Sequence, residues 1–303
     1  MKTIFEALRN LFSSDNEFFA MARTGKRITH IAIAIPILIV FLLLAMFLSG
    51  SVFQLIFQDS DISRTFGDFY DLFFSFGTLI FIVWLWVKFF EKRSFKTIGF
   101  QWKNAFRKYM TGFLSGFVML GVVVGLMALF GVIGFKEKVE PFSIDFFGVM
   151  MLLLLGYIVQ GAAEEVMARG WQFQVIGARY KPWLGAVISS LMFALLHGLN
   201  PGVSALAVVN LLLFAFLLIF IILNDGSIWA ACGWHTAWNW TMENIYGLKV
   251  SGTDGGASVL GLTAEGPNYI TGGGFGPEGS IFTTIVLIAG MIIVLIRHSK
   301  KTK

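Results

Sequence analysis

The sequence predicts an all-α fold: a polytopic membrane protein with about eight transmembrane helices. Of its 303 residues, 56% are hydrophobic and only 14% are charged, whereas about 25% of the residues are charged in a typical soluble domain. The hydrophobic residues also gather in long runs, and most runs approach the roughly 20 residues that a helix needs to cross a bilayer. The net charge of +5 comes from basic residues that lie beside the ends of these runs. This is where the basic residues that set membrane topology are found. We therefore expect contact with the lipid bilayer and no binding of nucleic acid.

Eight apolar runs define the expected helices. They cover residues 29–57, 69–90, 110–134, 145–163, 183–199, 203–223, 227–247 and 281–297. The first run begins too late and is too long for a cleavable signal peptide, so we expect it to be retained as the first span. The third run contains Gly112-x-x-x-Gly116 and Gly121-x-x-x-Gly125. This spacing lets helices approach closely, and we interpret both motifs as packing.

Basic residues predict the orientation of the spans. Lys and Arg cluster in the N-terminal arm, in the 88–108 connection, at Arg179-Tyr180-Lys181 and in the tail over 297–303. Cytoplasmic connections of membrane proteins carry an excess of Lys and Arg, and eight spans place all four segments on one side. We expect an integral, multi-pass protein of a bacterial cell membrane with both termini in the cytoplasm.

The chain divides into five expected parts. They are a cytoplasmic arm (1–28), three variable transmembrane helices with their connections (29–144), a core (145–247), an extracytoplasmic loop (248–280), and the last transmembrane helix with a basic tail (281–303). The 248–280 segment is rich in glycine and has no periodicity, which predicts a mobile loop. The single cysteine, Cys232, excludes an intrachain disulfide.

The fourth expected helix ends with two adjacent acids, Glu164 and Glu165. A carboxylate inside a bilayer costs about 2.5 to 3.5 kcal/mol on insertion scales, so such a pair is a functional hypothesis by default. Glu165 and Arg169 are four residues apart, share a helix face and can pair. Glu164 is rotated by about 100° and is free to face another helix.

Histidines on two later helices have the same spacing to a polar or aromatic partner. Phe193 and His197 are four residues apart on the fifth expected helix, and His235 and Asn239 are four apart on the seventh. The turn at 179–182 separates the fourth helix from the fifth. Glu164 lies about 16 residues before its centre and His197 about 16 after it, which puts both roughly 24 Å from the turn at 1.5 Å per residue. We therefore expect Glu164 and His197 to be neighbours.

A carboxylate, two imidazoles and a carboxamide that converge in a cavity of low dielectric are suited to activating water. The carboxylate acts as a general base, and an adjacent histidine passes the proton to a leaving amine. The other histidine and the asparagine donate hydrogen bonds to an oxyanion. Taken singly, each residue also fits a structural role, as a Glu–Arg latch or an interhelical hydrogen bond.

Glu164-Glu165-x-x-x-Arg169, Phe193-x-x-x-His197 and His235-x-x-x-Asn239, in this order, resemble the three motifs of a known family. It is the CAAX protease and bacteriocin-processing family of intramembrane proteases, often called CPBP or Abi. The resemblance covers about residues 145–247, which would form the CPBP catalytic core in helices four to seven. The lead-in over 226–231 to the third motif is also similar to that of the family.

The resemblance implies a role for each motif residue. Glu164 would activate water with the help of His197, while His235 and Asn239 would form the oxyanion site. The supporting residues would be Glu165 and Arg169, which hold the first glutamate, and Phe193. We expect no cofactor and no metal, because the zinc pattern His-Glu-x-x-His is absent. A zinc metalloprotease that uses Glu164, His197 and His235 as ligands stays the alternative mechanism.

The function implied is that of a glutamic-type intramembrane endopeptidase. Its partner would be a membrane-associated peptide or protein substrate, either C-terminally prenylated or a leader-bearing precursor. Serine and aspartyl intramembrane proteases fit worse, because the Gly112–Gly116 segment has the wrong spacing for a nucleophile motif and Gly67-Asp68 lacks the first glycine of the aspartyl motif. A non-proteolytic scaffold, immunity or regulatory protein of the same fold stays the alternative function. Gln160 and Glu243 lie at helical spacing from motif residues and are candidates for the pocket wall.

Overall fold

The computed structural model describes residues 2–57, 63–136, 143–254 and 256–301. Parts of the connections that follow the first and third expected helices, residues 58–62 and 137–142, lie outside the described residues, as do the last two residues of the basic tail. The predicted all-α membrane fold is confirmed, since the described residues form helices and a single pair of short strands. The chain is an integral membrane protein.

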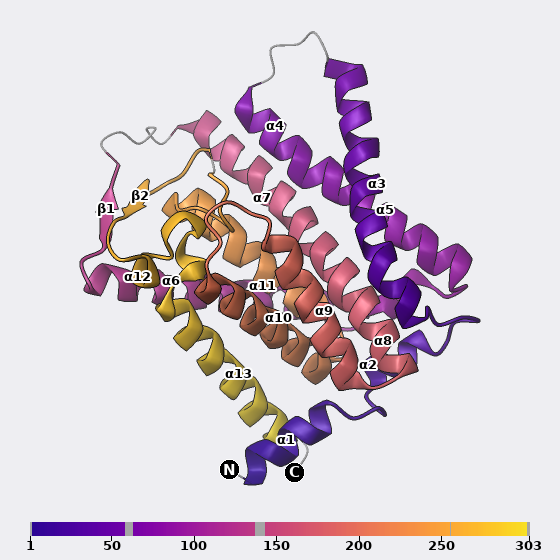
Figure 1. Ribbon diagram of the computed structural model, residues 1–303. Coiled ribbons are helices and arrows are strands. Elements are labelled where there is room, and N and C mark those ends of the chain that lie inside the picture. Colours follow the sequence, from indigo (N-terminus) through magenta and orange to yellow (C-terminus); the bar gives the residue numbers. More distant parts are fainter. Residues whose placement is uncertain (1, 58–62, 137–142, 255, 302–303) are drawn as a thin grey trace.

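Figure 1 shows the order of the helices along the chain. Short helices α1 (Lys2–Leu11) and α2 (Glu17–Ala22) precede α3 (Ile31–Phe57). The next long helix runs from Arg64 to Phe90 through α4 (Arg64–Tyr70), η1 (Asp71–Ser75), α5 (Phe76–Leu85) and η2 (Trp86–Phe90), where η1 and η2 are π-helical. A short 3₁₀ helix, η3 (Phe95–Ile98), then leads to α6 (Ala105–Leu129).

The second half of the chain holds the predicted core. It contains α7 (Ile144–Glu165), the π-helical η4 (Val166–Phe173), α8 (Gln174–Arg179), α9 (Pro182–His197), α10 (Ala205–Asp225), α11 (Trp229–Trp240) and the π-helical η5 (Thr241–Tyr246). After it come α12 (Asn268–Thr271), the 3₁₀ turns η6 (Gly273–Phe275) and η7 (Pro277–Gly279), and α13 (Ile281–Lys301). Strands β1 (Ile133–Phe135) and β2 (Leu262–Ala264) pair antiparallel.

Six helices of the described residues are long and apolar enough to cross a membrane. The other two predicted spans are α9, which has 16 residues, and α11 with its continuation η5. Helix α9 is apolar but shorter than the six, and α11 with η5 does not reach their combination of length and hydropathy. The lipid-facing side is clearest on α3, where Leu43, Met46 and Phe47 are 61%, 67% and 69% exposed.

The fourth helix is longer than predicted. We expected a span over 145–163, but the helix continues without a break from Ile144 to Arg179, a length of 36 residues. The polar residues after Gln160 do not end it, because their side chains find partners within the bundle, as Glu165 and Arg169 do. The helix ends only where Tyr180 and Lys181 precede the first residue of α9, Pro182, which confirms the predicted turn.

Helix α11 lies at the centre of the bundle and packs against α6, α7 and α10. Its backbone contacts the backbone of α6 directly, at glycines of α6 that have no side chain. A Cβ atom at Gly112 would lie 1.9 Å from the carbonyl oxygen of Ala230, and one at Gly116 would lie 2.5 Å from that of Trp234. The first glycine motif is therefore a packing motif, as predicted. In the second motif, a Cβ at Gly121 would lie 3.4 Å from Tyr246 Oη, whereas no atom lies within 4 Å of one at Gly125. The packing interpretation therefore holds for Gly121 and not for Gly125.

The 248–280 segment is folded rather than a bare connection. Strand β2 pairs with β1, with Ile133 opposite Ala264, and Phe275 is fully buried. The segment also lies directly on the chain after α9, since a Cβ at Gly252 would come within 2.1 Å of the carbonyl oxygen of Pro201. Sequence periodicity gave no sign of this, because glycines that permit close approach contribute no pattern of their own.

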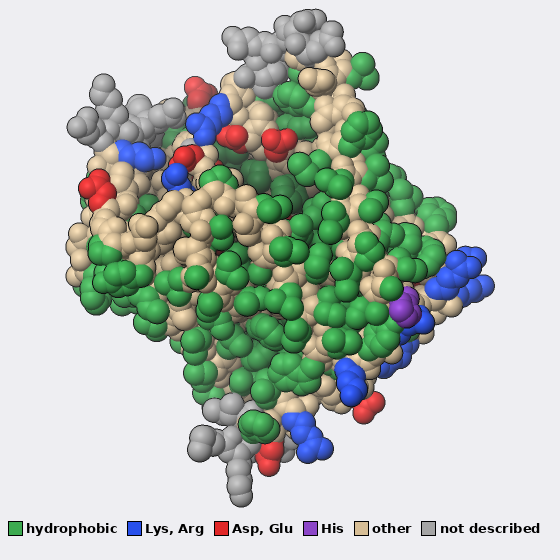
Figure 2. All heavy atoms as spheres, in the orientation of Figure 1, with side chains coloured by type: hydrophobic (Ala, Val, Ile, Leu, Met, Phe, Trp, Pro, Cys, Tyr) green, Lys and Arg blue, Asp and Glu red, His purple; other side chains and the backbone are tan. Residues whose placement is uncertain are grey.

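The four basic segments meet at one end of the structure. Arg179 donates to the carbonyl of Ile28 in the N-terminal arm, Lys108 donates to the carbonyl of Asp225, and Lys301 lies 3.8 Å from the Asp225 carboxylate. Helices α1 and α13 contact each other at this end (Figure 1). Figure 2 shows Lys and Arg side chains gathered along the lower right edge of a largely hydrophobic face.

Candidate active site

The acid pair stands where the fourth helix changes its geometry. Glu165 is the last residue of the α-helical part, and the π-helical stretch η4 begins at Val166. Such stretches often occur at functional sites. Across this change, the guanidinium of Arg169 donates from Nη1 to Oε1 of Glu165 over 2.8 Å, and both side chains are fully buried. The predicted pair is confirmed.

Glu164 faces the histidines of two other helices. Its Oε2 atom lies 3.8 Å from Nε2 of His197 on α9 and 3.8 Å from Nε2 of His235 on α11. The hairpin arithmetic from the sequence is therefore confirmed for Glu164 and His197. Both distances are longer than a hydrogen bond, and Oε2 is a buried acceptor without a hydrogen-bond partner among the described residues.

The two imidazole rings are held so that Nε2 faces Glu164. Nδ1 of His197 lies 2.9 Å from the carbonyl oxygen of Phe193, and Nδ1 of His235 lies 2.9 Å from Oε1 of Glu165. A carbonyl oxygen accepts hydrogen bonds only, and so does an ionised carboxylate. Each Nδ1 therefore carries a proton, and each Nε2 is the atom available for chemistry.

Asn239 reaches Glu164 through a third residue. Its Nδ2 atom donates to Oε1 of Gln160 over 3.1 Å, and Nε2 of Gln160 donates to Oε1 of Glu164. Gln160 therefore holds the oxygen of Glu164 that faces away from the histidines. Its spacing to Glu164 had suggested only that it lines the pocket, because the sequence does not show that Asn239 lies beside it.

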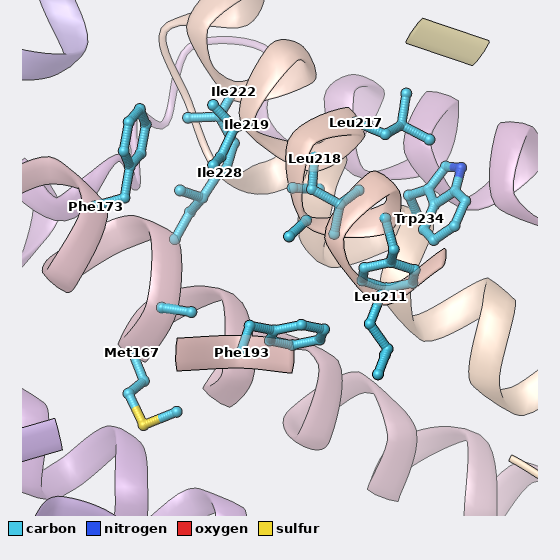
Figure 3. Close-up of a cluster of buried hydrophobic side chains, with 14 of the residues drawn as sticks. Met167, Phe173, Phe193, Leu211, Leu217, Leu218, Ile219, Ile222, Ile228 and Trp234 are labelled. Carbon is cyan, nitrogen blue, oxygen red and sulfur yellow. The ribbon is translucent and has the colours of Figure 1, made fainter. Parts of the chain in front are cut away.

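Phe193 supplies an apolar wall beside the charged groups. The guanidinium carbon of Arg169 lies 4.1 Å from the centre of its ring, and the ring of His197 lies 4.4 Å away. A cation over an aromatic face is stabilised by the ring quadrupole. Figure 3 shows Phe193 in a hydrophobic cluster with Leu211 of α10 and Trp234 of α11.

Access to the site is from the side of Glu164 and His197. Their side chains are 12% and 18% exposed, whereas that of His235 is 3% exposed and that of Glu165 is fully buried. All seven motif residues therefore come together in one cluster, with the deeper members behind Glu164.

Glu165 and Glu243 make contacts that the sequence does not indicate. Glu165 contacts His235 as well as Arg169, and Gln160 donates a hydrogen bond to Glu164. Glu243 makes no hydrogen bond or ion pair with the motif residues in the described part of the chain. Its charged neighbours are Asp68, Arg64 and Asp254.

Residues 146–241 match the family model described as type II CAAX prenyl endopeptidase Rce1-like. The predicted resemblance to the CAAX protease family is confirmed over this segment. The match begins within α7 and ends at the start of η5, so it contains all seven motif residues and leaves out the 248–280 segment. The family is one of proteases that act on membrane-associated proteins. The comparison with curated proteins gave no significant match, and neither did the comparison with solved structures.

The residues of the alternative zinc site are Glu164, His197 and His235, and the Nε2 atoms of both histidines lie 3.8 Å from Glu164 Oε2. Zinc ligands lie about 2.0 to 2.2 Å from the ion when they are nitrogen or oxygen atoms. Among the described residues, no group of three or more His, Cys, Asp or Glu side chains is placed to hold a metal ion. We derive no step through zinc.

Proposed function

We propose that the chain is an intramembrane endopeptidase of CAAX-protease type in which Glu164 and His197 activate water without a metal. The observation that carries this proposal is the position of Glu164 Oε2, unpaired and 3.8 Å from both Nε2 atoms. An acceptor buried without a partner is costly. It is suited to accept a hydrogen bond from water beside a scissile peptide bond.

The proposed reaction begins when water attacks the peptide carbonyl. The water oxygen forms a bond to the carbonyl carbon, and its proton moves to Glu164. Glu164 passes this proton to Nε2 of His197, which transfers it to the nitrogen of the leaving amine, and the carbon–nitrogen bond breaks. The products are an amine and a carboxylic acid, which loses its proton to water. His197 is suited to this shuttle because the Phe193 carbonyl fixes Nδ1 as the protonated atom.

His235 and Asn239 stabilise the tetrahedral intermediate in this proposal. Asn239 has two amide protons, and Gln160 accepts one of them, so the second can be donated to the oxyanion. His235 donates from Nε2 when both ring nitrogens are protonated, and Glu165 stabilises that charge at Nδ1. Donors fixed in advance at such a position are worth several kcal/mol in the transition state.

The proposed substrate is a membrane-associated protein or peptide precursor. Its cleavage site reaches Glu164 from the partly exposed side of the site, at a depth set by the hairpin of η4, α8 and α9. A C-terminally prenylated protein and a leader-bearing precursor both meet this requirement. The basic segments place both termini in the cytoplasm in this proposal.

The test compares membrane peptides from cells that carry the wild-type chain, Glu164→Gln or the control Glu265→Gln. Glu265 is exposed and lies in the 248–280 segment. We expect uncleaved precursors to accumulate with Glu164→Gln only, and their sequences identify the substrate class. Identical peptide profiles and an intact cellular phenotype in all three strains contradict the proposal and support the non-proteolytic scaffold.

A further inference from the structure

Glu278 is a buried acid outside the matched family segment. It lies in η7, between β2 and α13, and is only 6% exposed. Its Oε2 atom accepts hydrogen bonds from the backbone N–H of Ser251 (2.6 Å) and from Ser251 Oγ (2.8 Å). Its Oε1 atom accepts one from Trp238 Nε1 (3.2 Å). Three donors from two distant segments therefore converge on one carboxyl group.

These contacts do not explain Glu278 as a source of stability. No Lys or Arg forms an ion pair with it in the described part of the chain. Burial raises the pKa of its carboxyl, and the hydrogen bonds of Ser251 and the charge of His197 only partly oppose this effect. A buried charge without a paired cation costs several kcal/mol. Stability therefore does not account for a carboxyl group at this position, and its contacts point to another role.

One reason is its contact with the helix that carries His235 and Asn239. Trp238 immediately precedes Asn239 in α11, and its ring stacks on Trp234 with the ring centres 4.6 Å apart. The backbone of Glu278 is itself fixed, because its carbonyl accepts a hydrogen bond from Asn210 of α10 (2.7 Å). The carboxyl group therefore holds the indole of Trp238 from a fixed position.

A second reason is its connection to the end of α9, where His197 is the last residue. Ser251 is held by Glu278 in a left-handed backbone conformation with φ of 48°, which costs free energy for a residue other than glycine. In this conformation its carbonyl accepts a hydrogen bond from Asn200 Nδ2 (2.9 Å), three residues after His197. Glu278 thus reaches the turn that follows His197 through a single residue.

We propose that Glu278 is a positioning residue of the active site, which fixes the end of α9 relative to α11 and thereby the distance from His197 to His235 and Asn239. Ser251 and Glu278 then belong to the catalytic unit, whereas exposed residues of the 248–280 segment such as Glu265 do not. The expected effect of Glu278 on activity rests on the proposed function. Its expected effect on the positions of α9 and α11 is independent of any substrate.

The experiment compares the purified full chain with Glu278→Gln and the matched control Glu265→Gln. An amide has one acceptor oxygen, so Glu278→Gln cannot satisfy Ser251 and Trp238 together. We expect faster backbone hydrogen exchange at residues 196–202 and 238–244 in Glu278→Gln alone. Cleavage is measured with an internally quenched farnesylated peptide that ends in a CAAX sequence. We expect kcat to fall at least tenfold and KM to change less than twofold, at a thermal stability close to that of the control.

Unchanged hydrogen exchange in both regions overturns the inference, and so does a kcat equal to that of the control. If the wild-type chain does not cleave the peptide, this counts against the proposed function for that substrate, and hydrogen exchange alone decides the inference. If Glu278→Gln does not fold, Ser251→Gly replaces it, because glycine removes the hydroxyl donor and tolerates the left-handed conformation. It should produce a smaller change at 196–202 in the same direction, and no change there overturns the inference.

Discussion

Nδ1 of His235 lies 2.9 Å from Oε1 of Glu165, across the contact between α11 and α7. The same oxygen accepts the hydrogen bond from Arg169. The second acid of the pair therefore contacts an imidazole whose other nitrogen faces the first acid. In the proposed mechanism, Glu164 acts on the attacking water and Glu165 orients His235.

Glu165→Gln should reduce kcat while Glu164 stays in place. In metal sites, mutation of the residue that orients a histidine ligand costs roughly 10- to 100-fold in activity. We expect a loss of similar size here, because the amide no longer stabilises a charged His235. The measurement is single-turnover cleavage of the peptide substrate by the purified variant. A rate equal to that of Glu265→Gln would show that the contact has no role in the reaction.

The thermal stability of Glu165→Gln tests whether Glu165 acts in the reaction or only stabilises the fold. Glu165→Gln leaves the fully buried charge of Arg169 without its partner, and breaking such a pair costs about 3 to 5 kcal/mol. The double variant Glu165→Gln with Arg169→Met removes both charges, so we expect its melting temperature to recover toward that of the wild type while activity does not. Recovery of both together would assign the pair a structural role only.

The two glycine motifs of α6 should respond differently to alanine. Gly112→Ala places a methyl group 1.9 Å from a backbone oxygen of α11, and overpacking of this kind costs about 1 to 3 kcal/mol. Gly125→Ala meets no atom within 4 Å and gains helix propensity. Thermal unfolding in detergent should therefore show a lower melting temperature for Gly112→Ala and an equal or higher one for Gly125→Ala. Equal losses would contradict the close contact of α6 with α11.

The stability difference between the wild type and Glu278→Gln should depend on pH. Burial raises the pKa of the Glu278 carboxyl above its usual value of 4.5. Stability from a group with a raised folded-state pKa is complete below its unfolded pKa and is lost as the pH rises through the folded value. The difference in melting temperature should therefore shrink as the pH is raised from 4.5 toward neutrality. A difference that grows over this range would show that the folded protein stabilises the charged form.

The pairing of Glu164 with His197 could be predicted because a helix has a fixed rise and the turn at 179–182 lies midway between the two residues. The pairing of Glu165 with Arg169 followed from helical spacing in the same way, although the helix is π-helical between them. These relationships are local or symmetric about one turn, so sequence distance translates directly into distance in space.

The contacts of Gln160 and Glu278 could not be predicted in this way. Gln160 meets Asn239 across 79 residues, and Glu278 meets Trp238 across 40. The first pair depends on how α7 and α11 pack together. The second depends on the fold of the 248–280 segment, whose glycine-rich sequence has no periodicity from which that fold could be predicted. The change to π-helical geometry after Glu165 likewise has no signal in the residues themselves, because Val166–Phe173 reads as ordinary amphipathic helix.

A strong zinc chelator should leave the cleavage rate of the purified wild-type chain unchanged, because the proposed base is a carboxylate and the proton carrier an imidazole. The control is a zinc protease assayed in the same detergent and buffer, which must lose activity. Loss of cleavage by this chain, followed by recovery with added zinc and not with magnesium, would replace the metal-free mechanism by the zinc alternative.

The most direct test of the account is the cleavage rate of purified Glu164→Gln. General base catalysis typically contributes about 100- to 10,000-fold to a rate, and the amide retains the hydrogen bond to Gln160 while losing the ability to take a proton from water. We predict a folded, membrane-inserted protein whose cleavage rate is at least about 100-fold below that of the wild type. A Glu164→Gln protein that cleaves at the wild-type rate would contradict the assignment of Glu164 as the base and the function proposed for the site.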